Sequence, residues 1–390
     1  IEVCLVGSEM CIRDSLILSF VFVACDDDNE GEDVNIVTPP ATYSFERNGS
    51  STVSFSGQTT RLNQSDELYG ALNSTDVTVS ALNLMFAGDG GSSAGFTNPD
   101  LNGTSKLIRS KTSASTLRGS AATQALFDAW ISEYVNDVVP NLGVDATSGS
   151  AGIFGSYQFN SKGQEIDQLF FKGLIGAFTL DQIVNNYIHP NQLDNGTNIE
   201  DNDNGVLSGT SNYTVMEHKW DEGFGYLYGH QGEVVADAGA SPSGSGNLLM
   251  KYFKKVNDNY DTTIAQSTYD AFKMGRAAIV AKNYTVRDEQ AAIIKQNLSK
   301  VVGQYAVHYL SGAVSKIGTA TGDDRLGAFH GLSEGYGFVL SLQFTNDGTD
   351  QPYFTKDEVD TYLTQLSNFY TVDVSTLQVM HDEIKSRFGI

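Results

Sequence analysis

The chain has 390 residues, with 47 acidic and 24 basic side chains and a formal net charge of −23. This length suits one large domain or two packed ones. The negative charge argues against nucleic acid as a partner. All cysteines lie at the beginning of the chain, at Cys4, Cys11 and Cys25. Disulfides, thiolate metal sites and nucleophilic thiols are therefore excluded for the rest of the sequence.

The first 25 residues are expected to be an artefact followed by an export signal. Residues 1–15 do not begin with Met, show no clean periodicity and resemble translated adapter sequence. The apolar run 16–24 is too short to cross a bilayer but has the length of a signal-peptide core. It ends at Cys25, and the sequence FVAC resembles a bacterial lipobox. This resemblance implies that Cys25 is lipidated.

An acidic tether is expected over residues 26–40. It begins with the run DDDNE and ends with two prolines. An acidic run directly after a lipidated cysteine resembles the signal that sends lipoproteins of the Bacteroidota to the outer face of the outer membrane. The resemblance implies a lipid-anchored outer-membrane protein exposed at the cell surface. The alternatives are a periplasm-facing position and, for the run itself, a merely solvated linker.

Residues 41–390 are predicted to be mainly α-helical, with a small β-hairpin at the start. Short strands at 42–46 and 52–56 flank the turn signal Asn48-Gly49. Helical patterns dominate after the hairpin.

The longest helices are expected between Pro242 and Pro352, a proline-free stretch rich in Ala, Leu, Lys and Gln. Two further helices are predicted near the end, because 355–358 and 375–378 match the capping-box pattern.

One motif occurs twice. The segments HKWDEGFGY (218–226) and HGLSEGYGF (330–338) share the pattern HxxxEG[FY]G[FY]. Self-similarity of this kind predicts an internal duplication. We expect a duplicated helical bundle with repeat 1 at about 106–236 and repeat 2 at about 247–345, followed by C-terminal helices at 355–389.

Residues four apart share one face of a helix, so His218 aligns with Glu222 and His330 with Glu334. An imidazole and a carboxylate one turn apart are suitable ligands for a divalent metal such as iron or zinc. Two such helices facing each other would supply four ligands. These four residues are therefore the candidate metal ligands. The alternative is a buried polar network that fixes how the two repeats dock.

Three neighbouring residues complete the predicted site. Asp221 is expected to orient a metal ligand from behind. Gly225 and Gly337 lie on the same stripes as the ligands, and glycine costs about 1 kcal/mol in a helix interior. Each glycine therefore indicates close approach of another backbone. No catalytic residue or organic cofactor is predicted, since the GxSxG match at 91–95 lacks the strand and helix of a nucleophile elbow.

The lipobox and the segments YSFERNGSSTVSFSGQTTRL, KGLIGAF, MEHKWDEGFGYLYG and FHGLSEGYGF resemble the Bacteroidota lipoprotein family of domain of unknown function 4856. The resemblance covers nearly the whole chain after the lipobox. More distantly, the duplicated helices resemble imelysin-like proteins, whose pattern is GxHxxE. Both copies here have three residues between His and Glu, which departs from that pattern. Imelysin-like proteins are associated with iron uptake and were once classed as metallopeptidases.

These features predict a non-enzymatic binding lipoprotein that captures a metal ion or a metal-bearing nutrient for an uptake partner. The first alternative is a metal-dependent hydrolase or peptidase, in which one glutamate acts as general base on a metal-bound water. The second is a purely structural or adhesive surface protein, in which the polar stripes only hold the repeats together.

Overall fold

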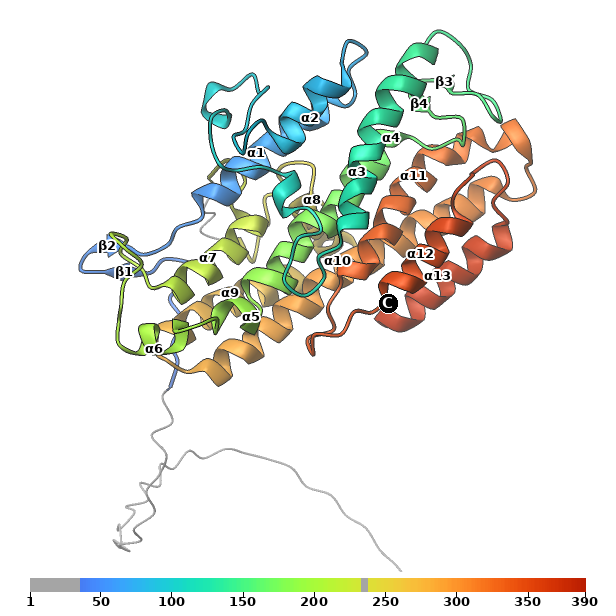
Figure 1. The fold of residues 1–390 in the computed structure, drawn as a ribbon. Helices are drawn as coiled ribbons and strands as arrows, with labels where there is room; N and C mark the ends of the chain where they lie inside the picture. The colour runs from blue at the N-terminus through green and yellow to red at the C-terminus, as the bar shows by residue number, and fades with distance from the viewer. Residues whose placement is uncertain (1–35, 233–237) are drawn as a thin grey trace, which may run out of the picture. The chain divides into compact units, whose positions relative to one another are not determined.

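The computed structural model describes residues 36–232 and 238–390. Residues 1–25, with the predicted lipobox and Cys25, lie outside the described residues. Residues 37–390 form one compact unit, which is mainly helical and carries a small hairpin near its beginning (Figure 1). The predicted fold class is confirmed at this level.

The α-helices of the described residues follow one another in this order: α1 Ser56–Ala71, α2 Val79–Ala87, α3 Ala121–Glu133, α4 Ile166–Leu174, α5 Pro190–Leu193, α6 Asn198–Asp203, α7 Val215–Tyr228, α8 Leu249–Asn259, α9 Ile264–Val280, α10 Tyr284–Ile317, α11 Leu326–Ser341, α12 Lys356–Gln365 and α13 Val374–Phe388. No helix of the described segments is long and apolar enough to span a bilayer.

The first hairpin has the predicted turn but shorter strands, β1 Glu46–Arg47 and β2 Ser50–Ser51. Asn48 and Gly49 both have positive φ, which a tight hairpin turn requires. The flanking residues leave the ladder because they bind the helical body. The ring of Tyr43, for example, stacks on Phe224 of α7 with centroids 3.6 Å apart.

A second hairpin, β3 Gly152–Phe154 with β4 Tyr157–Phe159, was not predicted. It lies among Gly- and Ser-rich residues that carry little strand signal. In Figure 1 it is at the upper right, whereas β1 and β2 are at the left beside α7. Its Tyr157 reaches α11, as described below.

One buried helical segment packs against both helices of the motif. Helix α4 continues through π-helical turns at Ile175–Leu180 and Ile183–Tyr187. Every residue from 166 to 187 is buried. We call this segment, residues 166–187, the central helix. Its first part packs on α11 and its last part on α7.

The proline-free stretch forms long helices, as predicted. Helix α10 has 34 residues and packs against α9, α11 and α13. Of the two predicted capping boxes, the one at Thr355 and Glu358 is confirmed. The other is wrong, because α13 begins two residues earlier and Asp373 is its N-cap.

Candidate functional site

Both copies of the motif form helices at the predicted places. Helix α7 begins with a capping box in which Thr214 and Glu217 bind each other's backbone N–H groups. This fixes the start of the helix so that His218 and Glu222 share its outer face. Helix α11 holds His330 and Glu334 in the same relation.

The four predicted ligands lie in two separate pairs. Nε2 of His218 is 4.0 Å from Oε2 of Glu222, and Nε2 of His330 is 3.7 Å from Oε2 of Glu334. Across residues 36–232 and 238–390, no group of three or more His, Cys, Asp or Glu side chains could hold a metal ion. The geometry therefore does not support one centre made of all four residues.

Each glutamate already forms an ion pair with a lysine ammonium. Nζ of Lys219 is 3.0 Å from Glu222, and Nζ of Lys172 is 3.4 Å from Glu334. A metal ion on either carboxylate would lie close to this positive charge, and the repulsion is strong where water is scarce. The donor set is thus a poor fit for a divalent cation.

In the α7 pair, Glu222 accepts a hydrogen bond of 3.0 Å from the amide of Gln58 on α1, and burial, aided by the charge of Glu222, raises the pKa of Tyr187 at the end of the central helix. The ring of Tyr213 stacks on His218 with centroids 4.5 Å apart. Nδ1 of His218 is buried, and no carboxylate of the described residues bonds to it. Burial lowers the pKa of His218, so this imidazole is neutral at pH 7.

In the α11 pair, the ring of Tyr157 stacks on His330 in the same way, with centroids 4.4 Å apart. Here, however, Nδ1 of His330 bonds to the carboxylate of Glu165 at 2.5 Å. Burial lowers the pKa of His330, but this bond more than offsets it, and the net pKa lies above the ordinary value. Glu334 also accepts a hydrogen bond of 3.4 Å from the phenol of Tyr252, and burial, aided by the charge of Glu334, raises the pKa of the nearby Tyr309.

Below the α11 pair, the central helix buries two charged groups. Burial lowers the pKa of Lys172 and raises that of Asp167 to about 7. Gln168 lies between them and bonds to both, at 2.7 Å each. Perturbed ionisable groups are common at functional sites, although structural networks also contain them.

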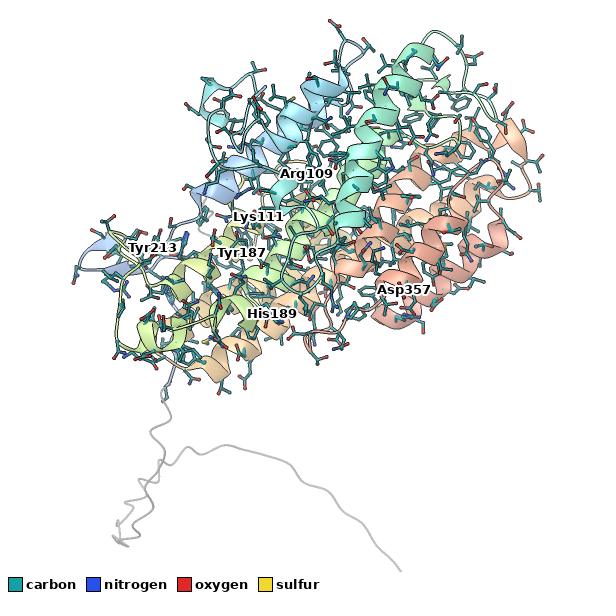
Figure 2. All side chains as sticks on the ribbon, in the orientation of Figure 1. Arg109, Lys111, Tyr187, His189, Tyr213 and Asp357 are labelled. Carbon is teal, nitrogen blue, oxygen red and sulfur yellow. The ribbon has the colours of Figure 1, made fainter. Side chains whose placement is uncertain are left out.

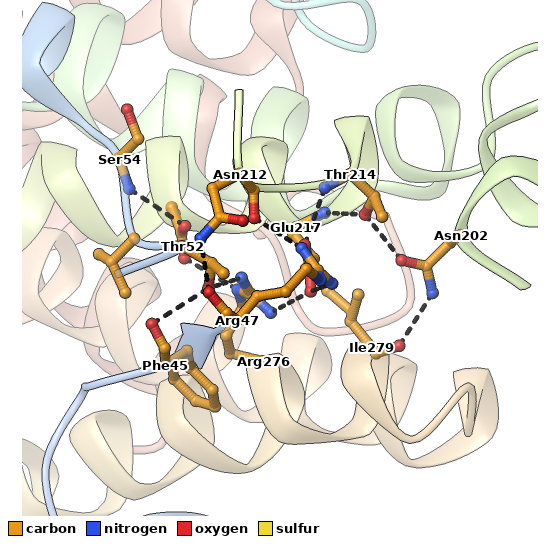
Figure 3. A network of polar contacts seen from close by, with 12 residues as sticks. Phe45, Arg47, Thr52, Ser54, Asn202, Asn212, Thr214, Glu217, Arg276 and Ile279 are labelled. Carbon is orange, nitrogen blue, oxygen red and sulfur yellow. Dashed lines mark hydrogen bonds and ion pairs between the residues drawn. The ribbon is translucent and has the colours of Figure 1, made fainter. Parts of the chain in front are cut away.

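Asp221 does not orient His218, and this part of the prediction is wrong. Its carboxylate is fully buried and faces the other way, binding Nε of Arg276 at 3.0 Å and the phenol of Tyr43 at 2.7 Å. Arg276, which comes from α9, also binds Glu217 at 3.1 Å. Figure 3 shows Arg276 and Arg47 meeting at Glu217, which fastens the first hairpin to α7 and α9. Asp221 is therefore part of a structural ion-pair network.

The two glycines differ in what approaches them, which is another backbone at Gly337 but a side chain at Gly225. A Cβ atom on Gly337 would lie 2.8 Å from the backbone nitrogen of Gly173 in the central helix. A Cβ atom on Gly225 would lie 2.8 Å from Cγ of Phe55. Real Cβ atoms do not come so close to other heavy atoms, so both glycines allow helix contacts that alanine would prevent.

A cavity that was not predicted from the sequence lies near the α11 pair. It has a volume of about 380 Å³ and opens between α8 and α10. Its lining residues are Lys255, Asn259, Tyr260, Tyr305, His308 and Tyr309. We call this cavity the α8–α10 pocket. The one sequence signal for it was the spacing of Tyr305, His308 and Tyr309, which share a helix face at i, i+3 and i+4.

A larger cavity of about 640 Å³ lies beside the first hairpin. It is lined mainly by serines and threonines together with Tyr43 and Phe55, and no charged side chain is among the described residues that line it. It does not adjoin either glutamate of the motif. The α8–α10 pocket, by contrast, combines a charged side chain with aromatic rings, and Glu334 lies near enough to act electrostatically on its lining residues Lys255 and His308.

The fold and the site define a mainly helical domain in which two histidine-glutamate helices carry lysine-paired carboxylates. The chain belongs to the family described as Domain of unknown function (DUF4856), whose model matches residues 40–390. The predicted resemblance to this family is thereby confirmed. Neither a curated protein nor a solved structure matches the chain.

Proposed function

We propose that this domain is the non-enzymatic binding part of a lipid-anchored outer-membrane lipoprotein, and that its ligand occupies the α8–α10 pocket. The observation that carries the proposal is a pocket lined by an ammonium group and aromatic rings, two of whose lining residues, Lys255 and His308, are close enough to feel the charge of the repeated Glu334. Its volume of about 380 Å³ lies in the range of small-molecule sites, which run from about 300 to 1,000 Å³.

The lining of the pocket favours a small organic anion that contains a ring. Tyr305, Tyr309 and Tyr260 supply aromatic walls, on which flat or ring-shaped ligands pack. Lys255 supplies the positive charge. Its Nζ lies 4.9 Å from the ring centroid of Tyr252 and 5.8 Å from that of Tyr305, and it forms no ion pair with any carboxylate of the described residues.

Two further donors stand beside this ammonium group. Asn259 offers a side-chain amide at the pocket wall, and Nδ1 of His308 lies 2.9 Å from the phenol of Tyr260. Burial lowers the pKa of His308, so the imidazole is neutral at pH 7. A ligand carboxylate placed against Lys255 would thus meet one full charge and neutral hydrogen-bond donors.

The metal-based alternatives fit these surroundings less well. A metal ion, or the metal-bound water of a hydrolase, needs a glutamate that is free to bind it. Glu334 is 3.4 Å from the ammonium of Lys172 and accepts a hydrogen bond from the phenol of Tyr252. We therefore replace the metal-bearing nutrient of the sequence analysis with an organic anion as the proposed ligand.

Export and anchoring are part of the same proposal. They are supported by the lipobox ending at Cys25 and by the acidic run over residues 26–30. A lipid anchor would display the domain at the outer membrane, where it would pass its ligand to an uptake partner. An imelysin-like evolutionary relationship would suit such a role.

The test is a thermal-shift screen of the purified protein with benzoate, 4-hydroxybenzoate and glucuronate. At least one of these ring-bearing anions is expected to raise the melting temperature. Lys255→Met is expected to abolish the shift because it removes the charge partner. Lys254→Met is the matched control, since its neighbouring ammonium pairs with Asp258 and does not line the pocket.

No shift with any of the three anions, or an equal shift in the Lys255→Met protein, would contradict the proposal. A shift produced by Fe²⁺ or Zn²⁺ that disappears in His330→Ala would support the metal hypothesis in its place. The structural alternative predicts no saturable shift with any of these additives.

A further inference from the structure

A cluster of basic side chains surrounds Glu222 at the junction of α1, α7 and the central helix. Lys111 lies at its centre, and Arg61, Lys106 and Lys219 are close enough to act on it electrostatically. Glu222 is the acidic group that acts on Lys111 from the same cluster. Four cations against one carboxylate is unusual in a chain whose net charge is −23.

The cluster is organised around the ring of Tyr187. Nζ of Lys111 lies 5.2 Å from the ring centroid, and Nζ of Lys219 lies 5.4 Å from it. Figure 2 shows Lys111 directly beside Tyr187 in the middle of the domain. Two ammonium groups are thus held against one aromatic ring, where cation–π attraction offsets only part of their mutual repulsion.

The single carboxylate does not neutralise both lysines. Glu222 is bound by Lys219 at 3.0 Å and by Gln58 at 3.0 Å. Within the described residues, Lys111 has no carboxylate within ion-pair distance, and the guanidinium of Arg61 donates to the backbone carbonyls of residues 57 and 107. Burial, followed by the charge of Arg61, lowers the pKa of Lys111 to about 8. Lys111 and Arg61 therefore carry positive charge that no carboxylate in the described part of the chain pairs with, at positions partly shielded from water.

The cluster is only partly covered by the fold, so part of it is exposed to solvent. The side chains of His218 and Lys219 are each 27% exposed, and that of Glu222 is 14% exposed. This exposure suits a small ion better than a large organic molecule. We propose that Lys111 and Lys219, together with the buried Arg61, form a binding site for a phosphate-sized oxyanion beside Tyr187.

This site differs from the α8–α10 pocket in its residues and its ligand, so either proposal can fail without the other. It also differs from a metal site in how the Glu222 carboxylate affects affinity. Glu222 would be an essential ligand for a metal ion, whereas it repels an oxyanion. Neutralising Glu222 should therefore strengthen oxyanion binding and destroy metal binding.

The experiment is isothermal titration calorimetry of the purified protein with inorganic phosphate in chloride buffer at pH 7. Saturable binding is expected in the unmodified protein. Lys111→Met is expected to weaken it by about tenfold or more, because one charge-assisted contact is lost. Glu222→Gln is expected to tighten it severalfold. Lys316→Met, which changes an exposed lysine on α10, is the matched control and should leave the affinity unchanged.

Folding of the variant is checked by its melting temperature in phosphate-free buffer. Lys111→Met should melt at or above the temperature of the unmodified protein, because it removes a half-buried ammonium that has no ion pair. The proposal is overturned if phosphate shows no saturable binding, if Lys111→Met binds as tightly as Lys316→Met, or if Glu222→Gln weakens binding.

Discussion

Helices α7 and α11 carry the same motif in surroundings that are alike on one face and different on the other. In both, a tyrosine ring stacks on the histidine and a lysine ammonium approaches the glutamate, at 3.0 Å for Glu222 and 3.4 Å for Glu334. The position three residues after the histidine differs, being Asp221 in α7 and Ser333 in α11.

This difference has a clear physical origin. Both side chains accept a backbone N–H from the start of a neighbouring helical segment, Asp221 from Ser54 and Ser333 from Glu165. Asp221 also neutralises the fully buried Arg276, whereas the hydroxyl of Ser333 donates a hydrogen bond to the backbone carbonyl of residue 329. The faces that the two helices share are thus the histidine, glutamate and glycine positions. The differing position is set by what packs beneath each helix.

The largest expected effect comes from breaking the network that only α7 has. Arg276→Met should leave Asp221 buried without its ion-pair partner and Glu217 with Arg47 alone, at a cost of about 3–5 kcal/mol in the free energy of unfolding. Denaturant unfolding measures this loss.

Arg109→Met is the control for this experiment, because its ion pair with Asp128 is about one-third exposed on each side and should contribute less than about 1 kcal/mol. Equal losses in the two variants would show that the Arg276 network does not stabilise the fold as its burial implies.

Ser333→Ala, the corresponding change beneath α11, should lower the free energy of unfolding by about 1 kcal/mol.

The contrast between the two helices also marks how far the sequence could be interpreted. The motif predicted both helices, because a pattern of nine residues contains the i, i+4 spacing, and it predicted the close backbone approach that is found at Gly337 but not at Gly225. It could not predict the direction of Asp221, since its partner Arg276 is 55 residues away and no local pattern links them. The aspartate follows the histidine within one turn, so it was interpreted as part of the same site.

The other missed features have the same cause. Lys111 meets Tyr187 and Lys219 only because three distant segments converge, and the α8–α10 pocket needs two helices that are separate in the sequence. The strands of the second hairpin have three residues each, too few to show an alternating pattern. Local periodicity and capping were sufficient for the helices, whereas charge complementarity over long distances required the folded chain.

The next prediction concerns what the two helices share. Gly337→Ala should destabilise the domain by about 1–3 kcal/mol, because its Cβ would overlap the backbone at Gly173. Gly331→Ala is the matched control in the same helix, where the nearest atom to an added Cβ is 4.0 Å away on Tyr309. That variant should be about 0.5–1 kcal/mol more stable, since alanine favours the helix. Thermal or denaturant unfolding compares the two, and a loss at both positions would contradict the contact argument.

The smallest effect distinguishes the two histidines. His330 should titrate above its ordinary pKa of about 6.5 because Glu165 holds the protonated form, and His218 should titrate below it because burial disfavours the charge. The stability that His330 contributes is complete below pH 6.5 and is lost as the pH rises through its raised pKa. His218 acts in the opposite direction, since stability increases as the pH rises from its lowered pKa toward 6.5.

An NMR titration, with His→Gln variants for assignment, measures the pKa values of both histidines. Glu165→Gln should lower the pKa of His330 and leave that of His218 unchanged, because only the α11 copy pairs its Nδ1 with a carboxylate. Equal shifts of both histidines in this variant would mean that the two copies share one electrostatic environment, contrary to their separate contacts.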